Sequence, residues 1–383
     1  MKFKKDLSSF DITAIVIGSI IGADIYITPG ISAGLIGPFS IIVWVIAGAF
    51  AVILAFVFAY SSHYVPKVGG PFAIVSKAYG NFFGFLAGWS MLIAEMMALP
   101  IFAIIFTKYL GFFVIIDSAT EIIIKGLFIF SLTAANVFGV KIGGKVNDVL
   151  TIIKLAPLFL VIISGIIYLS NNPEKLAENY FPLIPLGLEN FGSALVLIFW
   201  AYAGFEMATL PAGEIKNPGK IIPKAIGIGI AIVILFYLTT NFVLYGSVNW
   251  IDLSESNLPL VLIGTIVIGY LGGAIVSFGA MSSVSGASSS FVLGVARLYY
   301  AMSEKGLFPK VFSKTHPKFK TPYVALVIQG SIAFIISIFS GITDSISFSV
   351  FKIKQRSSLS FFPRSELFQN SWRDWAAENA LDR

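Results

Sequence analysis

The sequence predicts an all-α protein that crosses a membrane many times. Three observations indicate this fold class: 57% of the 383 residues are hydrophobic, only 12% are charged, and the apolar residues form long continuous stretches. A soluble domain carries about 25% charged residues. One spanning helix needs about 20 predominantly apolar residues. The composition therefore excludes a water-soluble protein.

Nine apolar stretches are long enough to cross a bilayer. In chain order they cover residues 11–36, 39–61, 81–109, 122–140, 146–169, 190–212, 221–245, 264–299 and 322–339. The first follows a basic start, as a signal peptide would, but it exceeds 20 residues and has no small-residue cleavage site. We therefore interpret it as an uncleaved first span.

Lysine and arginine predict the orientation, because cytoplasmic loops carry an excess of both. Successive ends of the nine stretches alternate between many and few lysine and arginine residues, and the N-terminus belongs to the set with many. We expect a multi-pass protein of the cell membrane, in contact with lipid, with a cytoplasmic N-terminus. The net charge of +6 is scattered between the spans, so no nucleic-acid partner is expected.

The residue inventory argues against an enzyme. The chain has no cysteine, and its two histidines, His63 and His316, fall in polar loops. No nucleophile–base pair, metal-ligand spacing or phosphate-binding loop is recognisable. We therefore expect no catalytic residues, no metal and no cofactor.

Two spans are interrupted near the middle of the membrane. Gly22 lies about eleven residues into the first, and Gly204 about thirteen residues into the sixth, which runs in the opposite direction. Paired interruptions at matching places in two halves are typical of an inverted repeat, here of five helices each, with discontinuous helices 1 and 6. The alternative is that Gly18 and Gly22 form a helix-packing face. A carboxylate beside each break favours a site.

Ionisable residues at mid-depth are costly unless they are paired or face a water-filled cavity. Asp24 and Glu206 lie at the two breaks, Glu95 lies midway along the third span, and Lys154 lies about eight residues into the fifth. Lys154 is a candidate proton carrier, the alternative being a lysine that snorkels to the cytoplasmic face. Glu206 is a second proton site or a cap for a free backbone N–H. Glu95 is expected only to pair with a neighbour.

Broken helices also supply ligand-binding backbone groups. Free N–H groups at a helix start hold an anion such as a carboxylate, and free carbonyls hold a cation. In the eighth span, residues 282–290 are rich in serine. Small residues at this density favour close helix packing. The alternative is that hydroxyls such as those of Ser282 and Ser283 line a cavity or bind Na⁺.

The C-terminal end differs from the rest of the chain. A tenth span should begin near Gly341, but residues 342–351 supply only half a crossing. Residues 352–383 then hold 10 charged residues in 32. We therefore divide the chain into a transmembrane domain, residues 1–350, and an atypical charged tail, residues 351–383, with no assigned role.

In its motifs the sequence resembles the amino acid–polyamine–organocation permeases. Residues 18–22, GSIIG, match that family's opening motif, and residues 200–206, WAYAGFE, resemble its most recognisable stretch. The resemblance covers about residues 8–350 and rests further on Pro66, Gly69, Gly70, Asn136, Gly139, Lys141, Gly144, Glu214, Asn217, Pro218, Pro223, Arg297, Leu298, Tyr299, Gly306, Pro309 and Pro322.

The resemblance implies a ten-helix inverted-repeat core, usually followed by two more helices, and secondary transport of amino acids or related amines. It assigns the substrate carboxylate to Ser19, Gly22 and Ala23. It assigns the amino group to Ala201, Ala203 and Gly204, and the lining or gate to Trp200 and Tyr202. Lys154 resembles the lysine that replaces a sodium ion in proton-coupled members. Glu206 resembles an acidic residue linked to pH response in antiporters.

This chain departs from the family at Asp24, where glycine is usual. A carboxylate there would repel a substrate carboxylate, but it would bind an amine or pair with Lys154, which favours a cationic or carboxylate-free small molecule. We expect a proton-coupled secondary transporter that works by alternating access. The alternatives are a sodium-coupled or exchange carrier, and a truncated homologue that does not transport.

Overall fold

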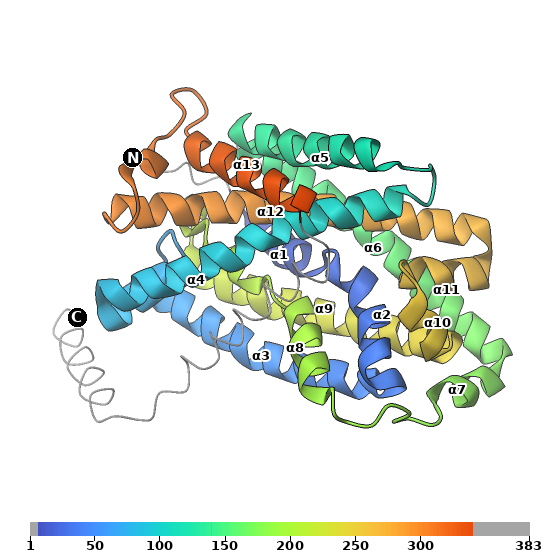
Figure 1. Ribbon diagram of the computed structural model, residues 1–383. Helices are drawn as coiled ribbons and strands as arrows, with labels where there is room; N and C mark the ends of the chain where they lie inside the picture. Colours follow the sequence, from blue (N-terminus) through green and yellow to red (C-terminus); the bar gives the residue numbers. More distant parts are fainter. Residues whose placement is uncertain (1–6, 139, 340–383) are drawn as a thin grey trace, which may run out of the picture.

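A computed structural model describes residues 7–138 and 140–339, and every regular element in them is helical. An isolated bridge joins Leu7 to Ile215. Figure 1 shows the long helices running along one common direction. The elements are α1 (Ser9–Ile20), α2 (Asp24–Ile36), η1 (Gly37–Phe39), α3 (Ser40–Tyr64), α4 (Pro71–Leu110), α5 (Ser118–Phe138), α6 (Val140–Asn171), α7 (Pro173–Tyr180), α8 (Phe191–Ala201), η2 (Phe205–Thr209), η3 (Ala212–Glu214), α9 (Pro218–Ser247), α10 (Trp250–Glu255), α11 (Pro259–Ile268), α12 (Tyr270–Glu304), η4 (Lys310–Ser313) and α13 (Tyr323–Phe339).

Seven helical segments of the described chain are long and apolar enough to cross a membrane, and α11 and α13 are shorter apolar helices. The first segment, Ser9–Tyr64, contains two of the predicted spans. The prediction of an all-α polytopic membrane protein is confirmed. The incomplete tenth span expected from residue 341 and the tail, residues 351–383, lie outside the described residues.

Glycine residues change the direction of two predicted spans, and one of these changes makes a predicted boundary wrong. The predicted eighth span, residues 264–299, is divided at Gly269, whose φ of 81° turns the chain between α11 and α12. The predicted third span begins at residue 81, where α4 (Pro71–Leu110) changes direction, because Gly80 (φ 84°, ψ 177°) is non-helical and divides α4 into two helices. Side chains rarely tolerate positive φ, so glycine permits both changes of direction.

The first and sixth spans are interrupted, as the sequence predicts. Helix α1 begins with a capping box, in which Ser8 and Asp11 each accept a backbone N–H of the other. It ends at Ile20, and α2 begins at Asp24 after three non-helical residues. Helix α8 ends at Ala201, and the chain continues past Gly204 as the short 3₁₀ segments η2 and η3.

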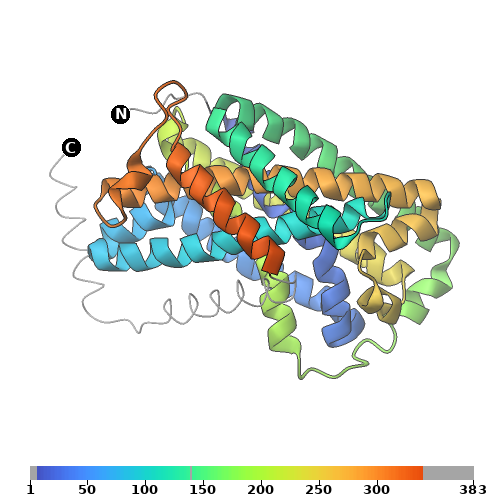
Figure 2. The ribbon, with the colours of Figure 1, turned by 45° about the horizontal axis from the view of Figure 1, so that its top comes forward.

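Helix packing follows the pseudo-symmetry of an inverted repeat. The first span packs against the seventh through α1 and α9, and the sixth packs against the second through α8 and α3. These two pairings are equivalent when the sixth span replaces the first and the seventh replaces the second. The pairs α3–α9 and α4–α12 cross between the halves. Helix α13 packs on α4 and lies beside α5, as a second view shows (Figure 2).

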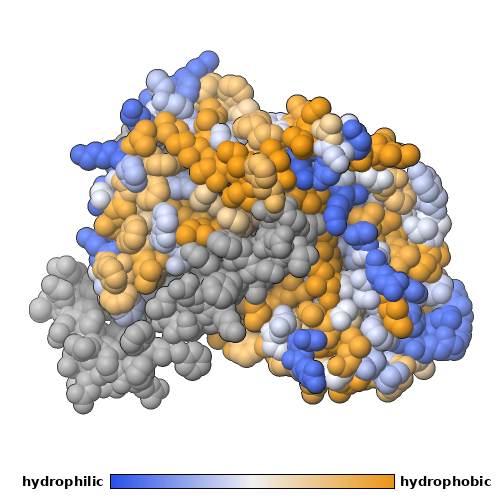
Figure 3. All heavy atoms as spheres, in the orientation of Figure 1, coloured by the Kyte–Doolittle hydropathy of each residue, from blue (hydrophilic) through white to orange (hydrophobic). Residues whose placement is uncertain are grey.

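The outer surface is suited to lipid. Large hydrophobic side chains such as Phe56, Phe82, Leu127 and Leu235 are more than half exposed. On the face drawn in Figure 3, apolar residues predominate above the grey atoms, and hydrophilic residues gather at the left edge and over the right part. Polar groups are instead buried around the two helix breaks.

Candidate functional site

The two helix breaks touch each other in the centre of the bundle. Gly204 adopts φ 127°, and a Cβ atom there would lie 2.8 Å from both the carbonyl carbon and the oxygen of Ser19. It would also lie 3.0 Å from the nitrogen of Ile20. A glycine is therefore required for the sixth span to meet the end of α1, backbone against backbone. The two predicted interruptions therefore lie side by side and form one candidate site.

Lys154 fills the carbonyl side of the first break. Its Nζ donates to the carbonyl oxygens of Gly18 and Ile21, at 2.7 Å each, and its side chain is fully buried in α6. The last carbonyls of a helix have no partner within the helix. The ammonium therefore satisfies backbone groups that the interruption leaves free, and it does not snorkel to a membrane surface in this structure.

Two hydroxyls from other helices complete this cluster of carbonyls. Ser283 of α12 donates from Oγ towards the carbonyl oxygens of Ile21 (3.0 Å) and Gly22 (3.1 Å). Tyr237 of α9 donates to the carbonyl oxygen of Ile20 at 2.8 Å. Helices α6, α9 and α12 are thus all attached to the end of α1, and a change at the break reaches each of them.

The carboxylate of Asp24 lies on the other side of the first break, where α2 begins. Asp24 occupies the first turn of α2, where the helix dipole favours a negative charge. Its side chain is 5% exposed, and among the described residues its Oδ1 has no hydrogen-bond partner. The buried Ser19 Oγ has none either. Buried polar atoms are nearly always paired, so two unpaired ones beside a helix break suit a polar ligand.

Glu206 caps a backbone N–H group of its own helix break. Its Oε2 accepts the backbone N–H of Gly204 at 2.9 Å, and Thr209 Oγ1 donates to its carbonyl oxygen at 2.6 Å. Of the two roles that the sequence leaves open, this contact matches the capping role. The proton role has no described contact of its own.

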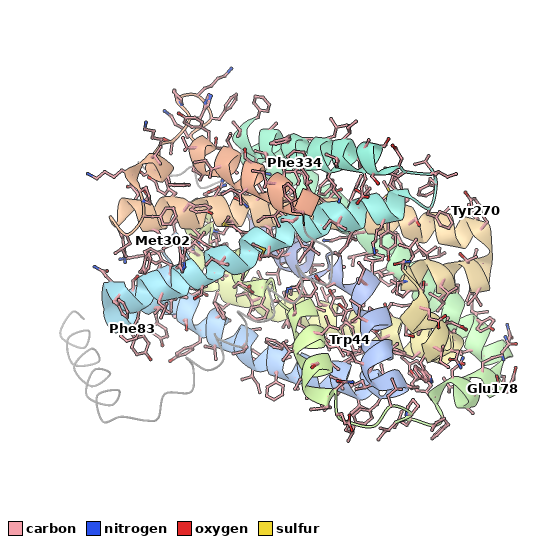
Figure 4. The ribbon with its side chains drawn as sticks, viewed as in Figure 1. Trp44, Phe83, Glu178, Tyr270, Met302 and Phe334 are labelled. Carbon is pink, nitrogen blue, oxygen red and sulfur yellow. The ribbon has the colours of Figure 1, made fainter. Side chains whose placement is uncertain are left out.

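Aromatic side chains pack behind the second break. Tyr202 is buried, lies 5.7 Å from the ring of Trp44 and 5.2 Å from the ring of Tyr237, and donates to the Trp44 carbonyl. Trp44 belongs to α3 and lies in the interior (Figure 4). Trp200 is only partly buried. The sequence singled out Trp200 and Tyr202 but gave no sign of Trp44 or Tyr237, which resemble ordinary apolar positions.

The remaining candidates separate into those at the breaks and those elsewhere. Ala23 and Ala201 are fully buried at the edges of the two breaks, whereas Ala203 is partly exposed. Ser282 donates to the carbonyl of Phe278 in its own helix, whereas the neighbouring Ser283 contacts the first break. A Cβ on Gly22 would lie 3.2 Å from both Ala287 Cβ and Asp24 Oδ2, so the first break is tightly packed in this structure.

The profile of the family described as amino acid permease matches residues 7–362. Over 372 residues the chain is 29% identical to the serine/threonine exchanger SteT of Bacillus subtilis (strain 168), covering 94% of this chain and 82% of the relative. It is 27% identical over 348 residues to the branched-chain amino acid permease BcaP of the same organism, covering 86% and 74%.

The fold is similar to that of a solved transporter. The crystal structure of MhsT in complex with L-phenylalanine superposes with a TM-score of 0.67, covering 90% of this chain and 81% of that one. The sequence identity is 14%, so the likeness concerns the fold alone. It agrees with an inverted-repeat architecture in which the first and sixth spans are broken.

Proposed function

This chain belongs to the amino acid permease family, and on that premise we propose that it is a proton-coupled secondary transporter of amino acids or related amines. The proposal includes alternating access around the two breaks, and a multi-pass protein of the cell membrane with a cytoplasmic N-terminus. The transport domain is residues 1–350. No catalytic role is involved, since the family and the relatives compared are transporters.

The contact of Lys154 with the end of α1 carries the proposal of proton coupling. A protonated lysine offers three donors and a full charge to the Gly18 and Ile21 carbonyls. Charge-assisted hydrogen bonds are about twice as strong as neutral ones. Loss of the proton therefore weakens the attachment of α6 to α1, and the first break becomes free to move. Proton binding and conformational change are then two coupled equilibria.

The same contact argues against a sodium ion at this place. Sodium in transporters of broken-helix design is held by freed backbone carbonyls. Here the carbonyls of Gly18 and Ile21 already accept from an ammonium, and Ser283 donates towards those of Ile21 and Gly22. A cation brought to the break would have to displace Lys154, so the proton is the coupling ion that the contacts favour.

The substrate is proposed to bind between the breaks with its amino group at Asp24. The unpaired Oδ1 of Asp24 accepts an ammonium, and the Ser19 hydroxyl offers a second polar contact. A substrate carboxylate held at Ser19, Gly22 and Ala23, as the family resemblance implies, would lie at the same break as Asp24 and would be repelled by its charge. A cationic amino acid or an amine without a carboxylate satisfies the site best.

Exchange is the second candidate function, because the relative SteT is named as an exchanger. An exchanger needs no proton movement, and Lys154 would then remain protonated as a structural link. Uptake of pooled labelled amino acids and amines into proteoliposomes separates the two. Accumulation that an inward proton gradient drives and a protonophore abolishes supports coupling. Labelled substrate that enters only when the vesicles are preloaded with unlabelled substrate supports exchange.

A further inference from the structure

A basic cavity lies far from the helix breaks along the chain, at one end of the bundle. It has a volume of about 320 Å³ and lies where α12 ends and α4 begins. Lys67, Lys77 and Lys305 all line it, together with a single acidic residue, Glu304. Figure 4 labels Phe83, near the start of α4, and Met302, near the end of α12, at this end of the bundle. None of the residues at the breaks lines it.

Tight packing of the backbone holds these lysines around one space. The turn that carries Lys67 passes through Gly69 and Gly70, both with positive φ. A Cβ on Gly69 would lie 2.9 Å from the Cβ of Ala301, so this turn lies directly against α12. Two elements distant in sequence therefore bring three lysines to one cavity.

The lining combines positive charge with an apolar wall. Three lysines against Glu304 give a formal charge of +2, and the Lys305 ammonium lies 5.1 Å from the centre of the Phe72 ring. Phe72 is buried and Tyr300 is half-buried. Pockets for small ligands have volumes of about 300–1,000 Å³, so this one suits a small anion or a headgroup and not a whole lipid.

Exposed aromatic side chains near the cavity indicate that it lies at the level of lipid headgroups. On α4, close to the cavity in sequence, the aromatic side chains of Tyr79, Phe82 and Phe83 are 53%, 72% and 48% exposed. Aromatic residues are enriched at the boundary between membrane and water. Anionic lipids of the cytoplasmic leaflet are attracted by lysines near the membrane surface.

We propose that this cavity is a binding site for a phosphate group, supplied by the headgroup of an anionic phospholipid, with Lys67, Lys77 and Lys305 as its ligands. The site is separate from the transport site and does not depend on which substrate the protein carries. Free inorganic phosphate shares the same chemistry and is the other source that the test distinguishes.

The test is native mass spectrometry of the purified full chain with phosphatidylglycerol or phosphatidylcholine added. The pocket variant is Lys67→Gln/Lys77→Gln/Lys305→Gln. The matched control is Lys310→Gln/Lys314→Gln/Lys318→Gln, which removes the same charge from exposed positions outside the cavity. Wild type and control should bind phosphatidylglycerol in preference to phosphatidylcholine. In the pocket variant the ratio of bound phosphatidylglycerol to bound phosphatidylcholine should fall at least about tenfold.

Radiolabelled inorganic phosphate identifies the source. A site for the lipid shows retention of phosphatidylglycerol that millimolar phosphate does not displace. A site for free phosphate shows saturable phosphate binding that only the pocket variant loses. The proposal is overturned when the pocket variant and the control bind both probes equally. The single variant Lys67→Gln repeats the comparison if the triple variant does not fold.

Discussion

The backbone of Gly204 lies directly against the backbone of Ser19, with no room for a side chain between them. A Cβ at Gly204 would approach the Ser19 carbonyl oxygen to 2.8 Å. This contact joins the two interrupted spans, and their free backbone groups are bound by Lys154 of α6 at the first break and by Glu206 at the second. Movement of one break is therefore expected to move the other.

Replacing this glycine should disrupt both breaks. We expect Gly204→Ala to abolish transport, and to lower stability by roughly 1–3 kcal/mol through backbone strain, with the clash against Ser19 in addition. Gly192→Ala is the matched control, because it lies in α8 with nothing within 4 Å of the added Cβ. Substrate uptake and thermal unfolding in detergent check this prediction. Normal uptake by Gly204→Ala would show that the contact is dispensable.

Glu206 offers a test that separates capping from proton exchange. Glu206→Gln keeps an oxygen that accepts the Gly204 N–H, so gradient-driven uptake should persist in this variant. Glu206→Ala removes the cap and should cost about 1 kcal/mol of stability, together with much of the activity. The two variants are compared for uptake at several pH values. If Glu206→Gln is as inactive as Glu206→Ala, the ionisable group itself is needed and the proton role returns.

Asp24 is expected to select the charge of the substrate. Asp24→Gly and Asp24→Asn both remove the carboxylate whose Oδ1 is unpaired, so preference should shift from cationic towards neutral amino acids. The measurement is competition of labelled substrate uptake by a panel of unlabelled cationic, neutral and acidic amino acids. The same ranking before and after both substitutions would show that Asp24 does not contact the substrate.

The buried ion pair between Arg297 and Glu214 should be essential for stability. Arg297 Nε lies 3.1 Å from Glu214 Oε1, and the two side chains are 1% and 5% exposed. Removing one partner leaves an uncompensated buried charge, which costs about 3–5 kcal/mol. We expect Arg297→Leu and Glu214→Leu each to lower the unfolding temperature strongly, and the double variant to recover part of the loss. A double variant as unstable as the sum of the two would argue against a direct pair.

The sequence predicted the spans and both breaks because apolar length and mid-membrane glycine are visible in one dimension. Lys154 is also visible in the sequence, since an ionisable residue at mid-depth is conspicuous, and its proton role stays a prediction. The sequence could not choose between Ser282 and Ser283, because the rotation of α12 decides which hydroxyl faces the break. The sequence does not reveal Tyr237 as part of the site, because an aromatic residue in an apolar span gives no sign of the carbonyl that it binds.

Boundaries were predicted less well where glycine changes the direction of an apolar run. Residues 264–299 look like one continuous span, but Gly269 folds the chain back so that α11 packs on α12. Gly264 and Gly272 allow this close approach, since a Cβ on Gly264 would lie 3.0 Å from the Gly272 carbonyl oxygen. Hydropathy records neither the sign of φ nor the pairing of two helices.

The measurement that tests proton coupling most directly compares wild type with Lys154→Ala in proteoliposomes, using two assays of the same preparation. Solute counterflow needs only alternating access, whereas accumulation under an inward proton gradient also needs the coupled proton. We expect Lys154→Ala to retain counterflow and to lose gradient-driven accumulation. Gradient-driven accumulation that is unchanged in Lys154→Ala would contradict the proposal that the lysine at the end of α1 carries the proton.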